Sequence, residues 1–188
     1  METLRISWYT ITEDLGPQKR FALWVQGCRK QCEGCIAPTL RDINGGTEIS
    51  VTEMADIVIS SGCDITISGG EPFLQSEALH RMIGIVREKR PQTGVICYTG
   101  YRYEDICDDP FIQDIDPLID GEYIGSLDDG RPMRGSSNQR LLFLTNRYSE
   151  DDMPTMRKNS IIFTENGFRM TGIPSDGARA FIDIMNGE

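Results

Sequence analysis

The 188-residue sequence has only one histidine, His80, so it lacks the Ser/His/Asp arrangement that many hydrolases use. It also has no run of about 20 apolar residues, the length that a membrane-spanning helix requires. Positive charge is scarce, because 19 Lys and Arg residues stand against 29 Asp and Glu, and the longest basic run is REKR at 87–90. These shortages argue against a hydrolase, against a membrane protein and against binding to nucleic acid through its phosphates.

The rest of the composition is that of an ordinary globular protein, with 39% hydrophobic and 26% charged residues. We expect one domain over residues 1–188, with a core at about 20–145 and a C-terminal extension at about 146–188. The first residues include acidic side chains and no long apolar run, which does not fit a signal peptide and predicts a cytoplasmic location. Cysteines stay reduced in that compartment, so the six cysteines are not expected to form a disulfide framework.

Short apolar runs alternate with amphipathic segments along the chain. The runs predict strands at 20–27, 64–70, 94–100 and 116–123, and helical spacing predicts helices at 50–62 and 75–91. Ser50 and Glu53 form a capping pattern at the start of the first helix. Later segments predict a loop running into a strand over 127–146, a hairpin at 160–172 with Asn166-Gly167 as its turn, and a short closing helix at 175–188. The alternation predicts an α/β fold with parallel βαβ units.

Three of the cysteines, Cys28, Cys32 and Cys35, lie within eight residues in the spacing Cys-x3-Cys-x2-Cys. A structural zinc site needs a fourth ligand, and the chain offers only His80, inside a predicted helix, and three cysteines scattered later in the sequence. A cubane iron–sulfur cluster held by three thiolates leaves one iron open to another ligand. The spacing therefore favours a cluster with an open iron over a structural zinc site.

A second motif, Gly69-Gly70-Glu71-Pro72, follows the next predicted strand after the cysteine loop. Two glycines at the end of a strand let the backbone approach a ligand closely, and Glu71 adds an anionic acceptor suited to an ammonium group. The carboxyl ends of parallel strands meet at one edge of a sheet, so we expect the two motifs to lie together there.

The two motifs together resemble the radical S-adenosylmethionine (SAM) superfamily, and within it the activating enzymes of anaerobic (class III) ribonucleotide reductases. Glycine directly before the third cysteine is also typical of that group, and the segments YTGY at 98–101, LIDGEY at 118–123 and RGSSNQR at 134–140 are similar to its later segments. The similarity extends over about residues 21–140. It implies a partial, open parallel β/α barrel of the radical SAM type, here with a C-terminal β-hairpin and a short helix.

The resemblance also implies the cofactors and their contacts. Cys28, Cys32 and Cys35 would bind three irons of a 4Fe-4S cluster, and the amine and carboxylate of SAM would bind the fourth. Reductive cleavage of SAM would then give a 5′-deoxyadenosyl radical that abstracts hydrogen from a substrate. The residues that the resemblance places at SAM are Gly69, Gly70 and Glu71 near the methionyl amine, Gly34 and Ile36 near adenine, and Asp120, Ser136 and Asn138 elsewhere on the cofactor. An alternative interpretation is that Asp120 is a solvated turn acid. Ser136 and Asn138 could equally belong to an ordinary polar loop, and both alternatives remain open.

The implied protein substrate is a glycyl-radical enzyme of the anaerobic reductase type, and the implied electron donor is a low-potential protein such as flavodoxin or ferredoxin. Ile36-Ala37-Pro38 stands where the group usually has an aromatic residue and an asparagine, and the C-terminal segment is longer than small activating enzymes need. These differences keep open a radical SAM enzyme that acts on a small molecule or a peptide. A non-catalytic iron–sulfur or zinc protein is the second alternative, but it would have no use for the Gly-Gly-Glu-Pro turn.

Overall fold

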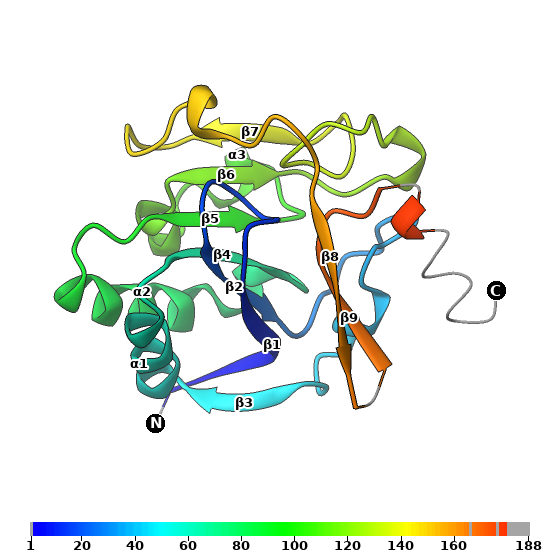
Figure 1. Cartoon of the computed structure of the whole chain (residues 1–188). Helices are drawn as coiled ribbons and strands as arrows, with labels where there is room; N and C mark the ends of the chain where they lie inside the picture. The colour runs from blue at the N-terminus through cyan, green and yellow to red at the C-terminus, as the bar shows by residue number, and fades with distance from the viewer. Residues whose placement is uncertain (1, 166, 176, 180–188) are drawn as a thin grey trace.

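The computed structural model describes residues 2–165, 167–175 and 177–179 (Figure 1). One seven-stranded sheet has the order β3-β1-β2-β4-β5-β6-β7, and β8 and β9 form a separate two-stranded sheet. The strands of the large sheet are β1 Thr3–Thr12, β2 Arg20–Val25, β3 Thr47–Ser50, β4 Asp64–Gly69, β5 Val95–Tyr98, β6 Pro117–Asp120 and β7 Arg140–Phe143, and the hairpin consists of β8 Asn159–Thr164 and β9 Gly167–Gly172.

Four neighbouring strands, β2, β4, β5 and β6, are parallel, as the strand–helix alternation predicts. The strands at the margins, β1, β3 and β7, run antiparallel to their neighbours. The register of β2 against β4 pairs Val25 with Gly69, so both strands end side by side. Because the parallel strands share a direction, the loops that follow them leave the sheet at one edge, on the right in Figure 1.

The α-helices are α1 Val51–Ser61, α2 Ser76–Lys89 and the short α3 Tyr103–Ile106. Ser50 caps α1 by accepting a hydrogen bond from the Glu53 amide, as its sequence pattern predicts. Leu79 and Met82 lie on the buried face of α2, where they meet the main hydrophobic core of the sheet. Together α1 and α2 cover one face of the large sheet, on the left in Figure 1. No helix in the described ranges is long and apolar enough to cross a membrane.

All four predicted parallel strands, both predicted helices, the strand after the 127–139 loop and the C-terminal hairpin are confirmed. Asn166, in the predicted hairpin turn, and most of the closing helix predicted at 175–188 fall outside the described residues. β1 and β3 are not predicted from the sequence. They extend the sheet on the far side of β2 from β4. A register shift between Ile6 and Trp8 breaks the two-residue alternation of β1, and β3 has only four residues.

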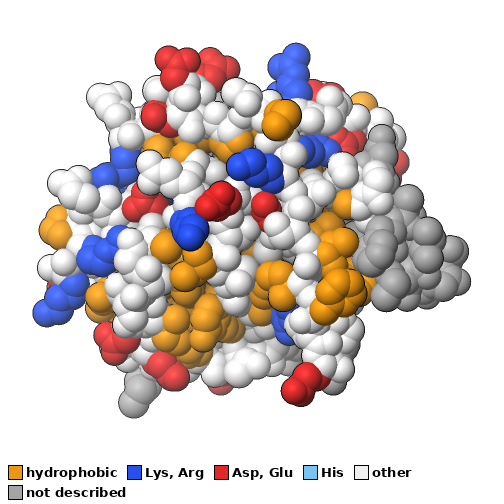
Figure 2. All heavy atoms as spheres, in the orientation of Figure 1, with side chains coloured by type: hydrophobic (Ala, Val, Ile, Leu, Met, Phe, Trp, Pro, Cys, Tyr) orange, Lys and Arg blue, Asp and Glu red, His pale blue; other side chains and the backbone are white. Residues whose placement is uncertain are grey.

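The face of the sheet opposite the two helices carries a smaller apolar cluster that contains Leu15, Ala22 and Trp24. The β8–β9 hairpin stands beyond the carboxyl edge of the parallel strands and crosses their direction (Figure 1). Figure 2 shows hydrophobic side chains gathered on the face of the molecule that carries β1 and the hairpin. Ile11 of β1 and Phe163 of β8 are among the exposed large hydrophobic residues of these two elements.

Candidate functional site

A pocket opens at the carboxyl edge of the parallel strands, and the two sequence motifs meet in it. Its lining includes the three clustered cysteines, which follow β2, and the Gly-Gly-Glu turn, which follows β4; the residues are Cys28, Cys32, Cys35, Gly69, Gly70 and Glu71. The convergence that the parallel-strand pattern predicts is thus confirmed. None of the three other cysteines is among the described residues that line this pocket, and Cys97 is fully buried in the main core.

Backbone hydrogen bonds join the two motifs directly. The Gly70 amide donates to the Val25 carbonyl and the Glu71 amide donates to the Gly27 carbonyl, both over 2.8 Å. A Cβ atom on Gly70 would lie 2.2 Å from the Gly27 oxygen, and Gly69 has φ +108°, a conformation that side chains disfavour. The two glycines are therefore required by the close approach of one motif's backbone to the other's.

The cysteine loop is fixed by hydrogen bonds at its start and at its turn. Its start is held to the segment after the loop, because the Cys28 amide donates to the Arg41 carbonyl over 3.2 Å and the Arg41 guanidinium donates back to the Cys32 carbonyl over 3.0 Å. Its turn is held to the loop after β6, because the Gly125 amide donates to the Glu33 carbonyl over 3.0 Å. Gly34 adopts φ +66° and packs its backbone against Gly125. The loop therefore has a defined shape around its three thiols.

The environment of the thiols suits thiolate ligands of an iron–sulfur cluster. The Lys30 amide donates to the Cys28 sulfur over 3.4 Å, and the backbone of Tyr123 acts to lower the pKa of the Cys32 thiol. Such N–H···S bonds stabilise the negative charge of cluster sulfur. Burial raises the pKa of both thiols in the free protein. Among the described residues no three Cys, His, Asp or Glu side chains are spaced to hold a single metal ion, whereas in a cubane each thiolate binds a different iron.

Glu71 is the most deeply buried charged residue of the pocket, with 1% of its surface exposed. Its carboxylate accepts hydrogen bonds from the Thr99 hydroxyl and the Gly100 amide, both over 2.8 Å, and from the Phe73 amide over 3.1 Å. Burial raises its pKa, while these three donors and the Lys30 charge oppose the rise. Glu71 therefore fastens the turn after β4 to the end of β5, and it brings a negative charge to the pocket wall.

Asp120, Ser136 and Asn138 lie outside the set of described residues that line the pocket. The Asp120 carboxylate is fully buried, where it accepts hydrogen bonds from the Tyr103 amide over 2.7 Å and from the Arg140 guanidinium, with Nε at 2.9 Å. The Ser136 hydroxyl accepts from the Ile124 amide, and the Asn138 side-chain amide donates to the Glu122 carbonyl. Ser136 and Asn138 thus fix the loop after β6, while Asp120 joins the end of β6 to α3 and β7; the residues of this loop that line the pocket are Gly121, Tyr123, Gly135 and Gln139.

Gly34 also lies outside the lining set, whereas Ile36 lies within it. Sequence reasoning missed several residues of the pocket wall. Trp24 could have been found from the alternation within the predicted strand 20–27, because its side chain and that of Ala22 share a face. Lys30 and Arg41 carry no signal beyond nearness to the cysteines. Gly172 and Ile173 line the pocket from a distant part of the chain, and no local pattern indicates this.

Comparison with known proteins gives consistent results over most of the chain. Residues 15–142 match the family described as a 4Fe-4S single cluster domain. The anaerobic ribonucleoside-triphosphate reductase-activating protein of Enterobacteria phage T4 is 33% identical over 132 residues, which cover 67% of this chain and 85% of that protein. The protein of the same name from Vibrio cholerae serotype O1 is 30% identical over 144 residues, which cover 70% of this chain and 92% of that protein. The pyruvate formate-lyase-activating enzyme of Listeria monocytogenes is 31% identical over 116 residues, 56% of this chain and 44% of that protein.

Proposed function

The chain belongs to the 4Fe-4S single cluster domain family and to the anaerobic ribonucleoside-triphosphate reductase-activating proteins, and on that premise we propose that it is a radical SAM activating enzyme. Cys28, Cys32 and Cys35 hold a 4Fe-4S cluster, SAM binds beside it, and the substrate is a glycine of a partner reductase. The observation that carries the proposal is the joining of the three-cysteine loop to the Gly-Gly-Glu turn within one pocket. When bound, the cluster would supply one electron for the cleavage of SAM, and the 5′-deoxyadenosyl group released from SAM would abstract hydrogen from the substrate.

The chain's own residues bind and orient these groups. The three thiols supply the ligands, and the Lys30 amide directs its N–H group at the Cys28 sulfur. Glu71 offers its negative charge to the methionyl ammonium, and the Gly69-Gly70 backbone, which has no side chains, leaves space for it. Trp24 and Tyr98 contribute aromatic rings to the pocket lining, which helps to exclude water from the site of a reactive radical.

Two further aspects belong to the same proposal. The parallel strands β2, β4, β5 and β6 form a partial, open β/α barrel, with the pocket at its carboxyl edge; the antiparallel strands β1 and β7 at its margins support an open form. An electron from a low-potential donor such as flavodoxin or ferredoxin would reach the cluster in the cytoplasm. The cysteine loop, which contains Lys30, is partly exposed at the protein surface, and this supports access by such a protein.

The test is an anaerobic assay. The protein is reconstituted with iron and sulfide, then mixed with SAM, dithionite and the anaerobic reductase, and 5′-deoxyadenosine is measured by chromatography and the glycyl radical by electron paramagnetic resonance. Cys32→Ala should abolish both products, while Cys107→Ala, a change at an exposed cysteine outside the pocket lining, should leave both intact.

The alternatives give different results in the same assay. Release of 5′-deoxyadenosine without a glycyl radical would indicate a small-molecule or peptide substrate. A stable cluster that neither binds nor cleaves SAM would overturn the proposal in favour of a non-catalytic iron–sulfur protein.

A further inference from the structure

The segment after residue 142 lies outside the match to the 4Fe-4S family, yet it reaches the pocket. Gly172 ends β9, and Ile173 follows it; both line the same pocket as the three cysteines. Ile173 has only 8% of its surface exposed, so its side chain is enclosed by the surrounding pocket wall. Part of the site is therefore built by a segment that the family match does not include.

Ion pairs attach this segment to the loop after β6. Asp128 accepts hydrogen bonds from Arg157 over 2.9 and 2.6 Å and from Arg179 over 2.8 Å. Arg157 has 9% of its side chain exposed, so this pairing is mostly shielded from solvent. Arg179 also donates to the Tyr123 hydroxyl over 2.8 Å, and Tyr123 lines the pocket. The segment is thus fixed to one wall of the pocket.

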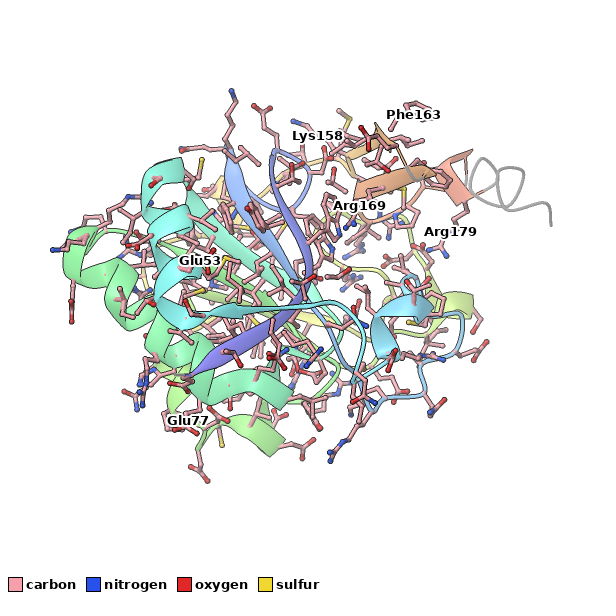
Figure 3. The ribbon with its side chains drawn as sticks, turned by 90° about the horizontal axis from the view of Figure 1, so that it is seen from below. Glu53, Glu77, Lys158, Phe163, Arg169 and Arg179 are labelled. Carbon is pink, nitrogen blue, oxygen red and sulfur yellow. The ribbon has the colours of Figure 1, made fainter. Side chains whose placement is uncertain are left out.

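A second set of contacts attaches the hairpin to the opposite wall. The Thr171 hydroxyl donates to the Asp14 carboxylate, directly beside Leu15, which lines the pocket. The Arg169 guanidinium lies 5.0 Å from the centre of the Trp8 ring, on the side of the hairpin that faces the sheet in Figure 3. Trp8 in turn stacks on Trp24 with ring centres 4.2 Å apart, and Trp24 lines the pocket. The hairpin therefore bridges two walls.

The lining of the pocket is chemically divided. Its charged residues, Lys30, Arg41 and Glu71, come from the cysteine loop, the segment just after it and the turn after β4. The lining residues that follow the hairpin or adjoin its contacts, Leu15, Trp24 and Ile173, are apolar. The ammonium and carboxylate of SAM match the charged side. An uncharged group such as the Cα–H of a glycine matches the apolar side, because a charged group there would lose its hydration without gaining a partner.

We propose that the β8–β9 hairpin together with Ile173 is the substrate-side wall of the pocket, and that Ile173 is a specificity-determining residue that contacts an uncharged, glycine-containing strand of the protein substrate. This inference rests on the proposed function and specifies where and how its substrate binds. Arg157 and Arg179 act as positioning residues, since they hold the wall against Asp128 and Tyr123.

The experiment compares Ile173→Glu with Phe163→Glu in the reconstituted holoenzyme. Phe163 is 71% exposed at the free end of the same hairpin, labelled in Figure 3, so it provides the same substitution outside the pocket. Two quantities are measured: 5′-deoxyadenosine released with dithionite in the absence of the reductase, and the glycyl radical formed on the reductase. We expect Ile173→Glu to lower the glycyl radical formed per 5′-deoxyadenosine released by about tenfold or more, while Phe163→Glu leaves both quantities unchanged.

A milder pair guards against misfolding. Ile173→Thr changes the side chain's polarity with little change in its shape near the backbone. Ile173→Val keeps an apolar, branched side chain and should give radical transfer close to that of the wild type. Thermal unfolding is recorded for every variant. The inference would be contradicted if Ile173→Glu and Phe163→Glu gave equal radical yields and Ile173→Thr gave the wild-type yield. That result would leave the proposed function intact. A wild type that releases no 5′-deoxyadenosine would overturn the proposed function, and the inference with it.

Discussion

The Glu71 amide donates a hydrogen bond over 2.8 Å to the carbonyl oxygen of Gly27, and this bond joins two motifs that are more than 40 residues apart in the sequence. Gly27 is the residue directly before the first cysteine of the loop, and Glu71 ends the Gly-Gly-Glu turn. The bond continues the parallel register of β2 and β4 past the last paired residues, Val25 and Gly69. The relative position of the two motifs therefore depends on the sheet ladder and on very few loop contacts.

Gly70→Ala tests this joint. The added Cβ would lie 2.2 Å from the backbone oxygen of Gly27, and neither atom can move without its own backbone, so the two segments must separate. We expect destabilisation of about 1–3 kcal/mol and a loss of bound iron after reconstitution, because the first cysteine shifts with Gly27. Iron content and thermal unfolding measure the two effects.

The matched control is Gly84→Ala in α2. Nothing lies within 4 Å of a Cβ at Gly84, and alanine favours the helix by about 1 kcal/mol, so this variant should be slightly more stable and bind iron normally. Normal iron content in Gly70→Ala would mean that the loop holds the cluster without its backbone joint to the turn.

Glu71→Gln removes the charge and one acceptor while keeping the shape of the side chain. Its amide group must face one of three donors, the Thr99 hydroxyl or the amides of Phe73 and Gly100. A buried donor without an acceptor costs about 1–3 kcal/mol, so the urea midpoint should fall, and affinity for SAM should fall as well. Glu77→Gln, on the exposed first turn of α2, should change neither quantity by much. Lower stability with unchanged SAM affinity would restrict Glu71 to holding the turn.

Arg140→Ala tests the role of Asp120, which the structure buries against this arginine. Removing the guanidinium leaves a fully buried carboxylate with the more distant Arg102, at 3.8 Å, and the Tyr103 amide. We expect a loss of about 3 kcal/mol in the free energy of unfolding. Arg81→Ala, which removes the exposed partner of Glu2, should cost at most about 1 kcal/mol. Equal stability of the two variants would mean that Arg140 contributes little to holding Asp120, and would favour the prediction that Asp120 contacts SAM.

Asp128→Asn should weaken the attachment of the C-terminal wall in a pH-dependent way. Burial alone would raise the pKa of Asp128, but hydrogen bonds and charge from Arg157, with the charge of Arg179, outweigh it and lower the pKa from 3.8 to about 2. Since the folded pKa is depressed, the stabilisation is present above about pH 4 and is lost as the pH falls toward 2. Thermal unfolding of the cluster-free chain should show wild type and variant differing at neutral pH and converging in acid. A difference that persists undiminished in acid would contradict the ionic origin of the attachment.

Local patterns were sufficient for most of the fold. Apolar runs indicated β2, β4, β5 and β6, helical spacing indicated α1 and α2, and the cysteine and glycine motifs indicated one site at the shared edge. Period and spacing are local properties, so the sequence shows them directly. The failures have local causes too, since the register shift in β1 disguised its alternation and β3 was too short to be recognised.

By itself, the sequence determined the α/β class, the parallel order of the central strands and the meeting of the two motifs, because strand direction brings successive loops to one edge. Only the tertiary structure decided which distant side chains complete that site. Asp120, at the end of β6, pairs with Arg140, and Ile173, from beyond the family match, lines the pocket. Both outcomes depend on contacts between segments far apart in the chain, whose energies no single stretch of sequence contains.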